Sequence, residues 1–135
     1  MKQALPVRSS DVDTIWDQVE PYIAAALARG RGTHTTEDVR KRCRERDAQL
    51  WIGIDDGLMA VAVTEICVYP QKKIARVWIF AAEDAPSWIE NDLGHIEAWA
   101  KAEGCSEIEM SGRLGWRKRL PGWAVREVLM TKELR

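Results

Sequence analysis

The stretch from Lys73 to Gly104 has the residue types and spacing best suited to chemistry. Residues Ile74–Phe80 have the pattern of a strand, Ala81–Pro86 form a short acidic loop, and Ser87–Glu103 have the pattern of a helix. In a strand–turn–helix unit the free N–H groups of the helix start face the end of the strand and can hold an anion such as a pyrophosphate. If this loop can bind such an anion, the protein is expected to be an enzyme; if it cannot, the protein is expected to act by binding a partner.

Other catalytic motifs are missing from the sequence. It contains no Gly-x-Gly-x-x-Gly fingerprint, no Walker loop and no Gly-x-Ser-x-Gly turn. His34 and His95 have no ligand neighbours at metal spacing, so we expect no metal. Cys43, Cys67 and Cys105 form no Cys-x-x-Cys pair, which indicates free thiols in a reducing compartment.

Length and composition bound the class of protein. The 135 residues are 46% hydrophobic and 30% charged with a net charge of −1, which is typical of one soluble domain over residues 1–135. The chain has no apolar signal core and no run near the ~18 apolar residues of a membrane span. We therefore expect a cytoplasmic protein with no membrane partner.

Helical patterns occupy the first third of the chain. Ser10, with Asp13 three residues on, is expected to cap an amphipathic helix that Pro21 kinks or breaks. A second helix is expected to begin at Thr35 or Thr36 and to turn only a narrow stripe inward. Its many basic side chains indicate either a solvated face or a docking face for acidic partners.

Three antiparallel strands should follow, at Leu50–Ile54, Leu58–Tyr69 and Ile74–Phe80, with a bulge near Glu65. On the third strand, alternation predicts Val77 and Ile79 on one face, opposite Arg76 and Trp78.

The central helix should begin at Ser87, with Glu90 completing a capping box, and bury one apolar stripe: Ile89, Leu93, Ile96 and Ala100. Ser106–Ser111 then reads as a strand parallel to its predecessor, because a helix separates the two. A basic helical turn and a final strand, Trp123–Leu134, complete an α+β fold: a mixed, mostly antiparallel sheet flanked by helices on both faces.

Several phrases, together with this order of elements, resemble the GCN5-related N-acetyltransferase (GNAT) superfamily. Pro6-Val7-Arg8 before an acidic amphipathic helix resembles its opening, and Ala98–Cys105 running into Glu107–Met110 resembles its central helix, glycine stop and fifth strand. Leu120–Trp123 stands where the family often has a Leu-x-Gly-Phe step. Gly112–Trp116 resembles a run found in small phage and prophage GNAT-like proteins.

The resemblance implies an acyltransferase that moves an acetyl group from acetyl-CoA to a small-molecule or protein amine. The cofactor would lie between the fourth and fifth strands and at the helix start, which implies these cofactor-binding residues: Ile79, Phe80, Ala81, Ser87, Trp88 and Ile89. The loop departs from the family pattern, because it has no glycine, Arg or Gln and carries Glu83, Asp84 and Pro86. These departures indicate a degenerate CoA-binding loop.

Catalytic residues are sparse by the same resemblance. The family's tyrosine on the short helix after the fifth strand is missing, since Arg117, Lys118 and Arg119 occupy that region. Glu65, Glu83 and Ser111 remain as candidates to accept a proton or orient a substrate, and each could equally be a solvated side chain. A tryptophan filling the gap between the two strands would exclude cofactor binding.

The alternative interpretation is a catalytically inactive GNAT-fold binding protein, such as a phage accessory or virion protein. Its partner would be a protein or a nucleic acid, and a homodimer is possible. An anionic partner would meet a basic, tryptophan-bearing face: Arg113, Trp116, Arg117, Lys118 and Arg119.

Overall fold

The computed structural model describes residues 1–112 and 114–135, and its regular elements lie between Gln3 and Arg119. In chain order they are β1 (Gln3–Val7), the 3₁₀ turn η1 (Ser9–Asp11), α1 (Val12–Ala28), α2 (Thr36–Arg44), β2 (Gln49–Ile54), β3 (Leu58–Val68), β4 (Lys73–Ala82), α3 (Ala85–Ala102), β5 (Glu107–Met110) and the 3₁₀ helix η2 (Leu114–Arg119).

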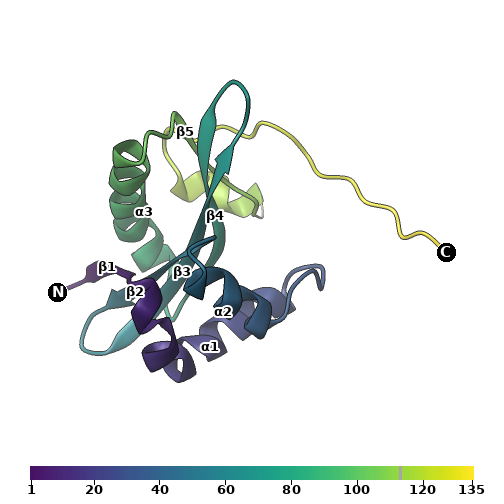
Figure 1. Cartoon of the computed structure of the whole chain (residues 1–135). Coiled ribbons are helices and arrows are strands. Elements are labelled where there is room, and N and C mark those ends of the chain that lie inside the picture. Colours follow the sequence, from purple (N-terminus) through teal and green to yellow (C-terminus); the bar gives the residue numbers. More distant parts are fainter. Residues whose placement is uncertain (113) are drawn as a thin grey trace.

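One sheet in the order β1-β2-β3-β4-β5 forms the centre of the molecule. Every neighbouring pair is antiparallel except β4 and β5, which are parallel because α3 carries the chain back between them. Helices α1 and α2 cover one face of the sheet and α3 covers the other (Figure 1). The predicted α+β class, mixed sheet and flanking helices are confirmed.

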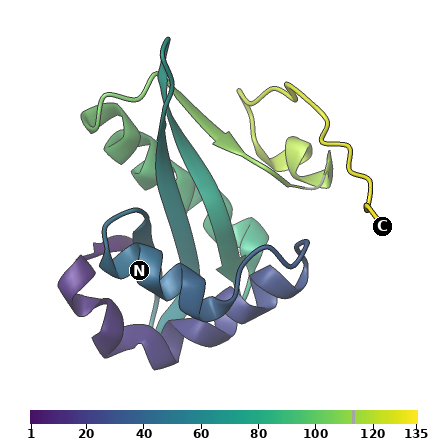
Figure 2. The ribbon, with the colours of Figure 1, turned by 45° about the vertical axis from the view of Figure 1, so that its right-hand side comes forward.

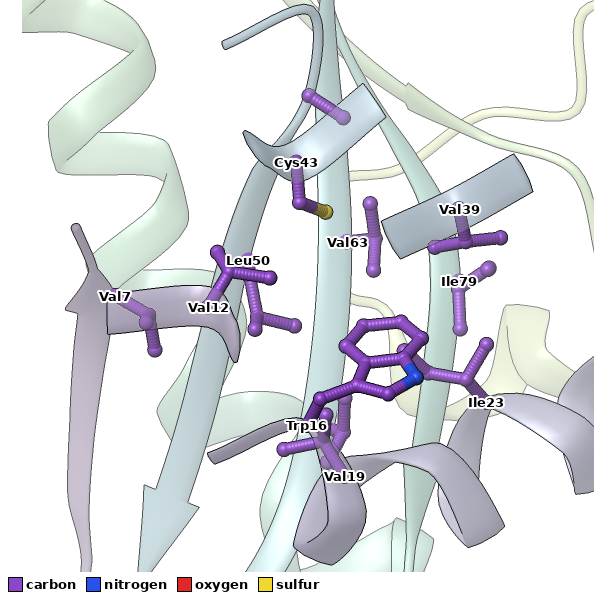
Figure 3. Close-up of a cluster of buried hydrophobic side chains, with 12 residues drawn as sticks. Val7, Val12, Trp16, Val19, Ile23, Val39, Cys43, Leu50, Val63 and Ile79 are labelled. Carbon is purple, nitrogen blue, oxygen red and sulfur yellow. The ribbon is translucent and has the colours of Figure 1, made fainter. Parts of the chain in front are cut away.

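The face under α1 and α2 holds an aliphatic core around one large side chain, Trp16, which is 1% exposed (Figure 3). Ile23 from the same helix and Val63 and Ile79 from the sheet pack around it. The indole also lies beneath the guanidinium of Arg40, 5.6 Å from its ring centre. Such burial is the main stabilising contribution to this layer.

The face under α3 holds a second core that is richer in aromatic side chains. The predicted α3 stripe is buried, as expected: Ile89, Leu93, Ile96 and Ala100. Trp51 packs edge-on against Trp99 at 5.5 Å and donates its indole N–H to Thr64 Oγ1 at 3.0 Å. The tryptophan therefore keeps its polar atom satisfied inside the core.

The start of the chain differs from prediction at two points. Ser10 lies in the η1 turn rather than capping α1, whose first flanking residue, Asp11, makes no side-chain cap bond. Helix α1 also runs without a break through Pro21 from Val12 to Ala28. Burial of its apolar stripe outweighs the one hydrogen bond that proline removes.

Helix α2 begins as predicted. Thr35 accepts from the Asp38 N–H at 3.2 Å, and the Asp38 side chain accepts from the Thr35 N–H at 2.8 Å, which completes a capping box. Val39 and Cys43 are its buried residues. Three of its four basic side chains contact carboxylates: Arg40 and Arg44 contact Asp13, and Arg42 contacts Glu65.

The last predicted strand is absent. Residues 123–135 form no strand, and the segment leaves the body of the protein (Figure 1). Its alternation is suited to a strand, but no strand of this sheet pairs with it.

No helix of the described residues is long and apolar enough to cross a membrane.

Candidate active site

A β-bulge in β4 determines which side chains surround the candidate site. Val63 of β3 pairs with Ile79 and the next residue, Thr64, pairs with Val77, so Trp78 is an extra residue on β4. Val77 consequently faces α3 while Ile79 faces α1, which corrects the prediction that both share one face. The bulge lies beside Glu65, as expected, but on the neighbouring strand.

Strands β4 and β5 part at this bulge. Their parallel pairing covers Ile74–Val77 against Glu107–Met110 only, whereas β4 continues to Ala82. Figure 2 shows β5 diverging from β4 beyond the paired region. Trp78–Ala82 therefore has β3 along one side, and no strand of the described residues along the other. This stretch contains the predicted cofactor residues Ile79, Phe80 and Ala81.

A row of charged side chains crosses the sheet next to the bulge. Glu65 on β3 accepts from Arg42 of α2 at 2.7 Å and lies 4.0 Å from Arg76 of β4. Arg76 in turn donates to Glu109 of β5 at 3.0 and 3.1 Å. Glu65 is thus a half-buried, ion-paired carboxylate, and Glu109 is a carboxylate near the gap that sequence reasoning missed.

The α1–α2 loop brings His34 to the same place. Its ring packs edge-on against Trp78, with ring centres 4.7 Å apart, and its Nδ1 shares a hydrogen bond with Thr33 Oγ1. The sequence alone treats His34 only as a possible metal ligand. No spacing in the sequence signals this contact, because it joins a loop to a strand far along the chain.

The other two catalytic candidates lie in different surroundings. Glu83 follows the end of β4 and accepts from Tyr22 Oη at 2.9 Å. It lies opposite Met59, six positions from Glu65 along β3, or about 20 Å. Burial and the Glu83 carboxylate together raise the pKa of the Tyr22 phenol. Ser111 is exposed directly after β5, where the two strands part. The structure therefore brings Glu65 and Ser111 towards the bulge and leaves Glu83 apart.

The start of α3 offers few donors to an anion. The helix begins at Ala85 after Asp84, which makes no side-chain cap bond, so Ser87 is not the predicted cap. Pro86 has no N–H, and the N–H groups of Ser87 and Trp88 both donate to the Asp84 carbonyl, at 3.0 and 3.2 Å.

The predicted cofactor residues at this helix start, Ser87, Trp88 and Ile89, already contact other protein side chains. The ammonium of Lys2 donates to both the carbonyl and Oγ of Ser87 and lies 5.3 Å from the ring centre of Trp88. Trp88 is 3% exposed and packs so closely on Gly53 that a Cβ there would lie 2.8 Å from the ring. Ile89 is 1% exposed in the same core.

The tryptophans flank the gap in different ways. Trp88 packs on β2 and Trp78 packs towards α1 and α2. Trp116 of η2 is half-buried against the α3-side core, the cluster that Phe80 and Met110 also join. The predicted basic face is only partly described: Lys118 and Arg119 are exposed, whereas Arg113 and the side chain of Arg117 lie outside the described residues.

A cavity of about 850 Å³ is lined by residues near the ends of α2 and α3 and by Thr64 and Ile66, the two neighbours of Glu65 on β3. Arg8, Arg46, Asp47 and Glu103 line it with equal numbers of positive and negative charges, and Trp99 lies at its wall. It contains none of the candidate site residues.

No protein-family model and no curated protein matches the sequence. Solved structures do match along the whole chain. An aminoglycoside acetyltransferase from an uncultured soil metagenomic sample, crystallised with sisomicin, superposes with a TM-score of 0.71 at 11% identity, covering 99% of this chain and 97% of the other.

Two further matches are similar in extent. The ribosomal-protein-alanine N-acetyltransferase of Brucella melitensis biovar Abortus 2308 gives a TM-score of 0.71 at 10% identity, with 100% and 99% coverage. A GNAT family acetyltransferase of Staphylococcus aureus gives 0.69 at 14% identity, with 98% coverage of both chains. The chain therefore has the fold of GNAT acetyltransferases, as its sequence resemblance implied.

Proposed function

We propose that this protein transfers an acetyl group from acetyl-CoA to an amine. The observation that supports this most strongly is the parting of β4 and β5 at the Trp78 bulge. It leaves the backbone of Trp78–Ala82 with a strand on one side only. A pantetheine arm carries amides and can pair with such a backbone as an added strand does. The bound cofactor would supply the activated thioester.

The two ends of this cofactor fit the protein unequally. The open β4 stretch suits the pantetheine arm, but the start of α3 does not suit a diphosphate. Ser87 already uses its N–H inside the helix, Pro86 has none, and Glu83 and Asp84 add negative charge. Lys2 is the cation that contacts this helix start among the described residues. We therefore expect weak binding, with a dissociation constant of about 0.1 mM.

On the acceptor side, we propose that Glu65 takes up the proton that the amine loses. Its carboxylate lies beside the bulge and is held in place by Arg42. His34 and Glu109 border the same region and would orient the amine. A positioned base of this kind contributes about 10²–10⁴-fold to the rate.

Release of free CoA thiol, followed in the presence of an amine panel, tests the proposal. The panel contains aminoglycosides, peptides with an N-terminal alanine, and polyamines, and the variant is Glu65→Gln. Turnover by the variant should fall by about 100-fold while acetyl-CoA affinity and thermal unfolding stay close to those of the native protein. Glu37→Gln, an exposed carboxylate on α2, is the matched control and should be silent.

A second candidate function is binding without catalysis, and the occupied start of α3 favours it. If acetyl-CoA shows no binding and no amine is acetylated, the fold would act as a docking module for a protein or nucleic acid. A phage accessory role belongs to this second candidate. Lys118 and Arg119, which are exposed after β5, would then be the first positions to replace with glutamate.

A further inference from the structure

Four charged side chains form a row across the sheet at the proposed acceptor site, in the order Arg42, Glu65, Arg76 and Glu109. Glu65 on β3 stands opposite Arg76 on β4, and Arg76 stands opposite Glu109 on β5. Positive and negative groups alternate along this charged row, so their formal charges cancel. A row without net charge gives no general attraction to a ligand that is only positive.

Two atoms of the charged row have hydrogen-bonding capacity left over. Arg76 donates through both Nε and Nη2 to one atom, Glu109 Oε1, at 3.1 and 3.0 Å. Glu65 accepts through Oε2 from Arg42 at 2.7 Å. Neither Arg76 Nη1 nor Glu65 Oε1 forms a hydrogen bond with a described residue. The row therefore offers one unused donor and one unused acceptor.

The unused donor and the unused acceptor lie close to each other. Arg76 Nη1 is 4.0 Å from Glu65 Oε1, which is too far for a hydrogen bond. The side chains of Arg76 and Glu65 are 39% and 17% exposed, so solvent reaches both. In a free amino acid, the amine nitrogen and a carboxylate oxygen are about 3 Å apart by standard bond lengths. Such a molecule can therefore contact Glu65 with its ammonium and Arg76 with its carboxylate at the same time.

Other classes of amine match the charged row less well. A polyamine or an aminoglycoside would bring several positive charges close to Arg42 and Arg76, and like charges repel. The amine of a protein N-terminus has no carboxylate beside it, so Arg76 Nη1 would gain no charged partner. A free amino acid brings one charge of each sign, and an arginine is well suited to bind its carboxylate.

We propose that the acceptor amine is that of a free α-amino acid, an inference that rests on the acetyl transfer proposed above. Arg76 is then the specificity-determining residue, because its Nη1 donates to the α-carboxylate. The amine nitrogen forms a bond to the acetyl carbon, and the carbon–sulfur bond of the thioester breaks. Of the ammonium protons, one passes to Glu65 and on to solvent, one ends on the CoA thiol and one stays on the amide nitrogen.

Calorimetric titration of the full chain with each common L-amino acid, in the absence and in the presence of CoA, tests the site. At least one amino acid should bind with a dissociation constant of about 1 mM. The α-amide of that amino acid keeps the amine and the side chain but lacks the carboxylate, so it should bind about tenfold more weakly or worse. Equal binding of acid and amide, or no binding by any amino acid, would overturn the proposal.

The variant Arg76→Gln tests whether this side chain causes the discrimination. It should bind the amino acid and its amide about equally, because it has lost the donor to the carboxylate, whereas a purely structural role would weaken both ligands alike and keep their ratio. Arg44→Gln is the matched control, since Arg44 is 43% exposed and contacts Asp13. The control should keep the native preference. If Arg76→Gln does not fold, the acid–amide comparison in the native protein decides.

Turnover separates this inference from the proposed acetyl transfer. Release of CoA thiol with an amino acid, but not with its amide, supports both. Turnover with polyamines, aminoglycosides or peptides alone would leave the acyltransferase standing and overturn the amino-acid acceptor. Binding of an amino acid without turnover of any amine would contradict acetyl transfer and leave the amino-acid site standing.

Discussion

Helices α2 and α3 begin in opposite ways. The start of α2 is closed by a complete capping box between Thr35 and Asp38. The start of α3 has no side-chain cap, and Pro86 occupies its first turn. Helix α3 nevertheless persists, because six of its residues are buried against the sheet, Trp88 and Ile96 among them.

The comparison shows that two sources of stability can replace one another. Local hydrogen bonds hold the first turn of α2, whereas burial from Trp88 onward holds α3 and does not depend on a side-chain cap. In the proposed function, the diphosphate of acetyl-CoA lies against this first turn of α3. Asp84 and Ser87, which precede the buried Trp88, can therefore change at little cost to the fold.

The largest expected loss of stability comes from a substitution that removes the burial on which α3 depends. Trp88→Ala should lower the free energy of unfolding by about 3–5 kcal/mol, since it deletes a buried indole that packs on Gly53. Urea denaturation measures this loss. Trp78→Ala, on the half-buried residue of the bulge, should cost clearly less, and an equal loss would contradict the difference.

The next effect concerns Asp92, a carboxylate 4% exposed in α3. Burial, opposed by the hydrogen bond from Asn91, raises the pKa of Asp92 from 3.8 to about 6. The folded protein then holds this proton more tightly than the unfolded chain does, so stability falls as pH rises from about 4 to 6. Asp92→Asn should therefore be more stable at pH 7 by up to about 3 kcal/mol and equal to the native protein near pH 3. Parallel stability curves would contradict this account.

A smaller effect compares the two caps directly. Thr35→Ala should cost about 1 kcal/mol, because one N–H of α2 loses its acceptor. Ser87→Ala should change stability by less than about 0.5 kcal/mol, since Ser87 does not cap α3. Thermal unfolding of both variants measures the contrast, and a larger loss at Ser87 would reverse it.

The smallest effect lies in cofactor affinity. Asp84→Asn removes a negative charge from the start of α3 and should tighten acetyl-CoA binding by about threefold at low salt. Calorimetric titration of both proteins measures the difference. Glu90→Gln, one turn further along the helix, is the control and should change affinity less.

Much of the fold could be predicted from local pattern. The buried α3 stripe, the hairpin turn at Asp55–Gly57 and the parallel pairing of β5 all follow from periodicity, turn residues and chain order. The start of α3 could not be placed, because Ser87 and Glu90 match a capping box, whereas the helix begins two residues earlier, at Ala85, with Pro86 in its first turn.

The site was less predictable because its contacts join distant parts of the chain. The Arg42–Glu65 pair joins helix α2 to β3, and the His34–Trp78 contact joins the α1–α2 loop to β4; no spacing in the sequence signals either contact. The bulge at Trp78 depends on how β3 pairs with β4, so alternation along β4 alone gave the wrong face for one of Val77 and Ile79. The predicted final strand failed because a strand pattern does not supply its own partner.

Hydrogen–deuterium exchange with and without acetyl-CoA tests the proposed site most directly. If the cofactor lies along the open side of β4, millimolar acetyl-CoA should slow exchange in peptides that cover Trp78–Ala82 and leave those covering Arg40–Arg46 unchanged. Unchanged exchange along β4, or protection confined to residues around the 850 Å³ cavity, would contradict an acyltransferase site between β4 and β5.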